Sequence, residues 1–133
     1  MTELSRILAG IALLSLVTVE FGGVFMTRIV RGSVPMTDFQ KSFARAGHAH
    51  AGVLVTLGLV CLLIADAAKV DGALGVVGRV GVLAAAIVLP GGFFASSAGR
   101  DVHQPNRAFA LVWTGAAVLA VGVVALGLGV LIS

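Results

Sequence analysis

The side chains with the clearest potential for chemistry are three histidines and two acids. They are His48, His50, His103, Glu20 and Asp101. Neutral imidazole is the most common protein ligand for metal ions, and carboxylate complements it. This donor set suits Zn, Cu, Fe or Mn. One or two of the histidines could instead serve as axial ligands of a b-type haem.

The His-Ala-His spacing limits how two of these histidines can act together. Residues two apart on an α-helix point about 200° away from each other, so His48 and His50 cannot both bind one metal ion from within a regular helix. Ala44 and Gly52 lie on the same face as His48, and such small residues favour close packing there. This slightly favours His48 as the interior residue, but either histidine could face inward. Any shared site must therefore be assembled across helices.

Glu20 is the only charged residue in a long apolar segment. Placing a carboxylate inside a membrane span costs about 2.5–3.5 kcal/mol on insertion scales. We therefore expect Glu20 to face the protein interior and to have a partner, such as Arg45 or a histidine of the second helix. A role as a metal ligand or a proton relay is the alternative.

Polar residues also gather in the connection before the last apolar segment. This short connection is held by Pro105 and contributes Asp101 and His103, with Arg100 and Asn106 as supporting polar groups. We expect it to lie over the same end of the molecule as His48 and His50. No H-E-x-x-H, P-loop or nucleophile-elbow motif is present, so the sequence leaves open whether the protein is an enzyme.

Four apolar segments must position these side chains. They cover residues 8–27, 46–65, 80–98 and 108–132, and each meets the roughly 17–25 residues that a membrane-spanning helix needs. Only 11% of the residues are charged, against about 25% in soluble domains. The sequence predicts an all-α fold in the lipid bilayer. We expect an integral membrane four-helix up-and-down bundle that forms one transmembrane domain over residues 1–133.

The distribution of Lys and Arg predicts an orientation. Six of the nine flank the first and third connections, and three lie on the other side. The positive-inside rule then places those two connections in the cytoplasm and both termini outward, in a multi-pass protein of the plasma (inner) membrane. The pI near 10 therefore indicates topology and anionic lipid as the reasons for the basic balance, and not nucleic acid.

Two local patterns concern the helices themselves. Thr37 and Gln40 have the spacing of a capping box, which predicts that the second helix begins near Asp38. Gly115, Gly122 and Gly129 recur every seven residues in the last segment and form a smooth stripe. Such a stripe allows close packing, either within the bundle or in a homo-oligomer.

Three blocks resemble small, uncharacterised bacterial four-helix membrane proteins. They are TVEFGG, RAGHAHAG and DVHQPNR, and they begin at Thr18, Arg45 and Asp101. This resemblance implies the fold and no particular activity. The arginine-then-histidine start of the second helix also resembles haem-ligand helices of the haem-copper oxidase and nitric oxide reductase superfamily. That resemblance covers one helical turn and implies that haem is a candidate cofactor.

Three functions are compatible with these features. The first is a metal or haem site near the cytoplasmic face, with a role in redox chemistry, sensing or metal handling. Its ligands would come from Glu20, His48, His50, Asp101 and His103. The second is a proton- or cation-coupled transporter or a channel-like oligomer, with Glu20 as the relay. The third is a non-catalytic accessory subunit of a larger membrane complex, docked through the glycine stripe.

Overall fold

The computed structural model describes residues 1–133 and contains four long α-helices and no β-strand. They are α1 (Glu3–Val30), α2 (Asp38–Ala67), α3 (Gly72–Ser96) and α4 (Ala110–Ile132), with a short 3-10 helix, η1 (Arg107–Phe109), before the last. All four helices are long and apolar enough to cross a membrane. This confirms the predicted all-α class, and it is consistent with a multi-pass membrane protein.

The helices extend beyond the apolar segments where the chain supplies caps or partners. At the start of α2, the Thr37 hydroxyl accepts a hydrogen bond from the Gln40 backbone N–H, and the Gln40 side chain accepts one from Thr37. The predicted capping box and the start at Asp38 are therefore confirmed. Helix α3 begins at Gly72, eight residues before the apolar segment, and its first turns include Arg79, whose side chain is buried.

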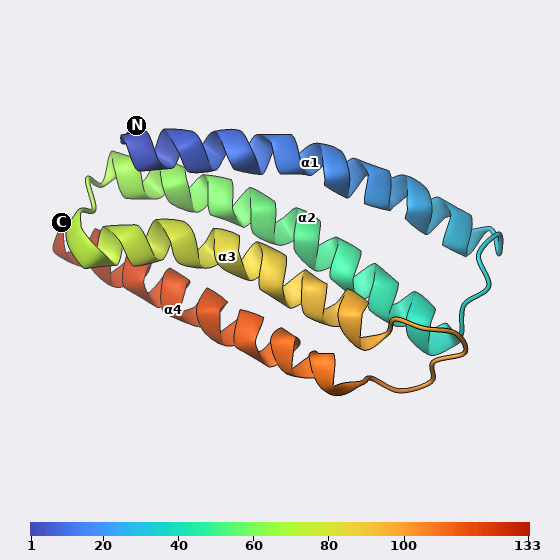
Figure 1. Ribbon diagram of the computed structural model, residues 1–133. Coiled ribbons are helices and arrows are strands. Elements are labelled where there is room, and N and C mark those ends of the chain that lie inside the picture. The colour runs from blue at the N-terminus through green and yellow to red at the C-terminus, as the bar shows by residue number, and fades with distance from the viewer.

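The helices lie side by side in chain order and alternate in direction (Figure 1). The arrangement is more open than the predicted bundle, because α1 and α4 make no contact. The two helices form opposite edges of a layer, with α2 and α3 between them. Both termini lie at one end, opposite the first and third connections (Figure 1).

The tightest contact in the layer joins α3 to α4, and glycine makes it possible. A Cβ atom on Gly115 would lie 2.6 Å from the Leu89 backbone nitrogen, and one on Gly81 would lie 2.9 Å from the Cα of Gly122. The stripe of α4 is thus buried against α3. This confirms packing within the chain as its role and makes the expected docking of a partner on the stripe wrong, because α3 already covers it.

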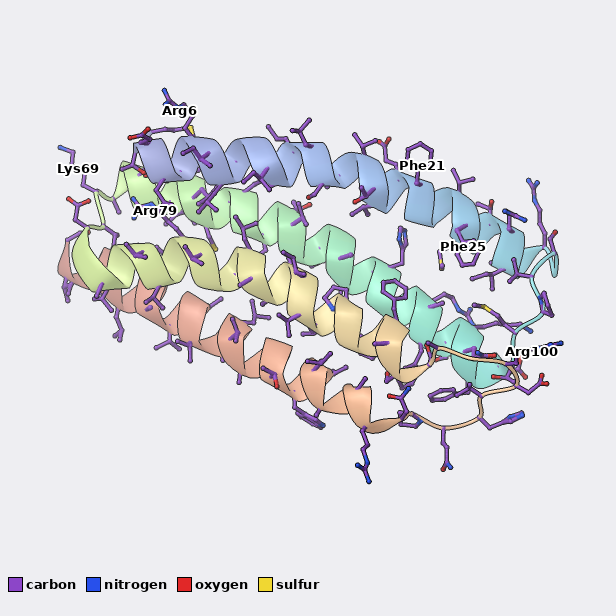
Figure 2. All side chains as sticks on the ribbon, in the orientation of Figure 1. Arg6, Phe21, Phe25, Lys69, Arg79 and Arg100 are labelled. Carbon is purple, nitrogen blue, oxygen red and sulfur yellow. The ribbon has the colours of Figure 1, made fainter.

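Helix α1 is held much more loosely than the others. Only Ser5, Ala12 and Ile29 are buried along its 28 residues. Ala12 joins a small core with residues of α2 and α3. Figure 2 shows Phe21 projecting from the outer side of α1 and Phe25 lying on the side that faces α2. Most of α1 is therefore a free surface.

Candidate functional site

His48 lies in the interface between α1 and α2. Its ring rests against two glycines of α1: a Cβ atom on Gly22 would be 3.1 Å from the Nδ1 atom, and one on Gly23 would be 3.6 Å from the Nε2 atom. The side chain is half-buried, and neither ring nitrogen forms a hydrogen bond within the chain. The pair of glycines in α1 therefore makes room for an imidazole.

His50 faces the opposite neighbour, α3. Its ring stacks on Phe93 with centroids 5.2 Å apart, and its Nδ1 atom lies 2.7 Å from the Ala46 carbonyl oxygen. A carbonyl oxygen only accepts, so Nδ1 carries a proton, and in the neutral ring Nε2 is then the nitrogen that can bind a metal ion. The predicted divergence of His48 and His50 is confirmed: the two rings face different helices.

The His50 ring ends a row of aromatic side chains that links α2, α3, η1 and α4. Phe93 meets Phe43 edge to face at 5.4 Å, and Phe43 also lies 5.9 Å from Phe109. Phe109 in turn contacts Trp113. This row forms one apolar wall on the side of the layer away from α1, at the end that carries the first and third connections.

Glu20 does not face the interior, contrary to expectation. Its side chain is exposed on α1 and forms no hydrogen bond or salt bridge with the rest of the chain. The expected ion pair with Arg45 is absent, because the only side-chain hydrogen bond of Arg45 runs to the Lys41 carbonyl oxygen at 3.3 Å. The reason lies in α1 itself. It is apolar on nearly every side, and its inner face at this level is taken by Gly22 and Gly23.

The third connection crosses the expected end of the molecule, but its ionisable side chains point to solvent. Arg100, Asp101 and His103 are all exposed. Gln40 is buried and holds the connection by donating to the carbonyl oxygens of Ser97 and Gly99, each at 3.0 Å. The connection is therefore tied to the start of α2 through its backbone, and His103 takes no part in that contact.

Asn106, which we expected to support a metal or haem site, links the ends of two helices in the structure. Its side-chain amide donates to the Ala95 carbonyl oxygen at the end of α3, and its amide oxygen accepts from the Ala108 N–H at the start of η1. One side chain thus caps the end of one helix and the beginning of the next. Thr37 anchors the same connection by donating to the Val102 carbonyl oxygen.

The five candidate ligands are therefore spread over four places. His48 lies between α1 and α2, His50 lies beside α3, and Glu20 is exposed on α1. Asp101 and His103 are exposed in the third connection. No three histidine, cysteine, aspartate or glutamate side chains gather in an arrangement that could hold a metal ion. A site with three or more of these ligands would need a second molecule or a rearrangement of the helices.

A polar network that the sequence did not predict lies at the opposite end of the layer. The Arg79 guanidinium donates to the Asp66 carboxylate at 2.8 Å, to the Ser5 hydroxyl at 2.9 Å and to the Val70 carbonyl oxygen at 2.8 Å. Thr2 donates to the second Asp66 oxygen through its backbone N–H at 3.0 Å. Arg79 and Ser5 are buried. The network therefore fastens the start of α1 to α2 and α3 (Figure 2).

The sequence shows both charged residues of this network, but their positions suggest a different role. Asp66 and Arg79 flank the short connection between the second and third apolar segments, so each looks like a residue that ends a membrane span. Opposite charges on both sides of a short connection also fit an ion pair. Buried in this way, Arg79 no longer counts as a free cation at its end of the molecule.

Comparison with known proteins adds no family to this description. No protein-family model, curated protein or solved structure matches the chain.

Proposed function

We propose that this protein is a multi-pass membrane subunit that binds a partner membrane protein through the outer face of α1. Glu20 is the observation that carries the proposal. It is the only charged residue in the four apolar segments, it lies ten residues before the end of α1, and it is exposed without a partner. Ten residues of helix correspond to about 15 Å of depth. An uncompensated charge at that depth is costly, so a polar partner on another molecule would stabilise it.

The charge distribution of the chain itself indicates what that partner offers. The cations of α1 and α2 nearest this level are Arg28, which lies eight residues or about 12 Å closer to the end of α1, and Arg45, which lies three residues or about 4.5 Å closer to the start of α2 than His48. Arg79 is buried at the far end with Asp66. A second copy in the same orientation would bring another Glu20 to this depth and no Lys or Arg, and its His48 and His50 rings are turned toward α1 and α3 of their own chain. The partner that complements Glu20 is therefore a different membrane helix carrying Lys, Arg or His at the matching level.

The free surface of α1 fits such a docking role. Large apolar side chains are exposed along it, including Val17, Phe21 and Val24 around Glu20. The glycine stripe of α4 is already covered by α3, so it is not free to bind another helix. Helix α1 is the loosely held edge of the layer and can accept one. The subunit would then contribute no catalytic group of its own, in keeping with the absence of a catalytic motif.

The charge bias also supports an orientation for this subunit. With Arg79 buried in an ion pair, the end with the termini exposes only Arg6 and Lys69 as cations, whereas six Lys and Arg side chains surround the first and third connections. We propose that those connections face the cytoplasm, that both termini face outward, and that the membrane is the plasma (inner) membrane.

Native mass spectrometry of the full chain, released from its own membrane, tests the docking proposal. The wild-type protein is expected in a complex whose mass exceeds 13.4 kDa by that of a different protein. Glu20→Leu is expected to release the partner while keeping the helices, because it adds apolar surface to a membrane span. Glu3→Leu removes a carboxylate from the exposed end of the same helix and is expected to keep the complex. Equal effects of both variants would contradict the proposal.

Binding of a b-type haem or a single metal ion through His50 is the second candidate function. The observation that favours it is the hydrogen bond from Nδ1 to the Ala46 carbonyl oxygen. Metal-binding histidines commonly donate one ring N–H to such a group and present the other nitrogen to the metal. The aromatic row beside His50 adds an apolar wall of the kind that a flat cofactor contacts. The remaining ligands would have to come from elsewhere, because no second candidate ligand accompanies His50.

An absorption spectrum and a metal analysis of the purified protein test this second candidate. A Soret band or a stoichiometric metal that is lost in His50→Ala and kept in His103→Ala is the expected result. His103 is the matched control, since its ring is exposed in the third connection. A wild-type protein with neither a Soret band nor bound metal would exclude this candidate and leave the docking proposal unaffected.

A further inference from the structure

A polar cavity lies between the end of α1 and the first turns of α2. Its volume is about 270 Å³, and it is lined by Ile29, Val30, Gly32, Lys41 and Arg45. The three larger cavities of the molecule are lined almost entirely by apolar residues. This one combines two cations with two aliphatic side chains and contains no acid in its lining.

The two cations have donors to spare. The Nε atom of Arg45 makes a long bond of 3.3 Å to the Lys41 carbonyl oxygen, and the two terminal nitrogens of its guanidinium have no partner in the chain. The Lys41 ammonium pairs with Asp38 at 3.1 Å, but that carboxylate is fully exposed, so water screens the pair. The paired terminal nitrogens of arginine match the oxygens of a phosphate group, which they bind as a fork.

The apolar side of the cavity fits a lipid better than a soluble anion. Val30 is 77% exposed and ends the long apolar surface of α1, while Ile29 is buried behind it. A group bound here would hold its charge against Lys41 and Arg45 and its apolar part along α1. That is the geometry of a phospholipid at the boundary between its headgroup and its acyl chains.

The field around the cavity has the sign that an anion needs. Six of the nine Lys and Arg residues lie at this end of the layer, and the opposite end carries equal numbers of cations and acids. Basic pockets between membrane helices on the cytoplasmic side are sites where anionic headgroups bind.

We propose that the cavity between α1 and α2 binds the phosphate group of an anionic phospholipid, with Arg45 as the two-pronged donor and Lys41 as the second cation. Ile29 and Val30 contact the upper part of the lipid chains. This inference rests on the membrane location put forward above and is independent of the partner on α1, because Glu20 does not line the cavity.

Native mass spectrometry of the full chain with added lipid tests the site. Phosphatidylglycerol is expected to be retained at one molecule per chain, in preference to phosphatidylcholine with the same acyl chains and to inorganic phosphate. The double variant Lys41→Gln and Arg45→Gln is expected to weaken phosphatidylglycerol binding roughly tenfold or more. Arg45→Lys, which keeps the charge and loses the fork, is expected to give an intermediate loss.

The control is a second double variant with the same net charge. Arg100→Gln and Arg107→Gln remove two exposed cations from the same end of the layer but outside the cavity. This variant is expected to bind phosphatidylglycerol nearly as well as the wild type, with circular dichroism showing equal helix content in all variants. Equal losses in both double variants would overturn the site in favour of diffuse attraction. Retention of inorganic phosphate as strong as that of the lipid would overturn the lipid as its occupant.

Discussion

Arg79 shows how a single side chain can hold the layer together at one end. Its side chain is 4% exposed, and it donates to Asp66, Ser5 and Val70. Arg79→Ala leaves the Asp66 carboxylate without its cation in a site where only 11% of that side chain is exposed. We expect this variant to lose about 3–5 kcal/mol of unfolding free energy, measured by denaturation in detergent.

Arg6 is the matched control for that measurement. It lies on the same end of the molecule but is 75% exposed and forms only a 4.0 Å contact with Glu3. Arg6→Ala is expected to change the unfolding free energy by no more than about 0.5 kcal/mol. A loss for Arg79→Ala as small as that of Arg6→Ala would mean that the network does not fasten α1.

The directions of individual side chains divide into those that the sequence determines and those that it does not. The divergence of His48 and His50 follows from the fixed angle between helical residues, and the structure confirms it. The direction of Glu20 does not follow, because α1 is apolar all round and no stripe marks its inner face. The pairing of Arg79 with Asp66 was not predicted, because Asp66 lies at the end of the second apolar segment and Arg79 lies before the third.

At the scale of the elements, glycines decide how closely α3 and α4 approach. Gly115→Ala would bring its new methyl group to 2.6 Å from the Leu89 backbone nitrogen, a contact that a shift of side chains cannot relieve. We expect a loss of about 1–3 kcal/mol of unfolding free energy, the usual cost of overpacking. Thermal unfolding in detergent would measure it.

Gly127 provides the control in the same helix. A Cβ atom there meets nothing within 4 Å, so Gly127→Ala adds no clash and replaces a poor helix former with the best one. This variant is expected to be neutral or slightly stabilising. If both substitutions destabilised the protein equally, the cost would belong to the helix as a whole and not to its contact with α3.

The helices themselves were largely predictable, because length and hydropathy set each apolar segment and the Thr37–Gln40 box marks one of the starts. The helix ends were less so. Helix α3 includes Arg79, whose buried side chain pairs with Asp66. The sequence did not decide whether the glycine stripe of α4 packs within the chain or docks a partner. The spacing of the glycines predicts that another helix lies close, but it does not identify that helix.

At the scale of the whole molecule, the layer has two edges that differ in character. The α3–α4 side is closely packed, whereas α1 is fastened at its first turn and otherwise held by a few small residues. The sequence predicts a bundle because four helices with short connections pack as neighbours. It does not predict that α1 and α4 stay apart, since closure depends on side-chain fit across the whole layer.

Photo-crosslinking in the native membrane tests most directly whether a different membrane protein docks on α1. A photoreactive amino acid in place of Val24, which lies one turn from Glu20 and is exposed, is expected to label one partner protein at a helix that contains Lys, Arg or His. The same probe in place of Val53, equally exposed on α2, is expected to label lipid and not that partner. Labelling of a second copy of this chain, or of lipid alone, from position 24 would contradict the docking of a different membrane protein on α1.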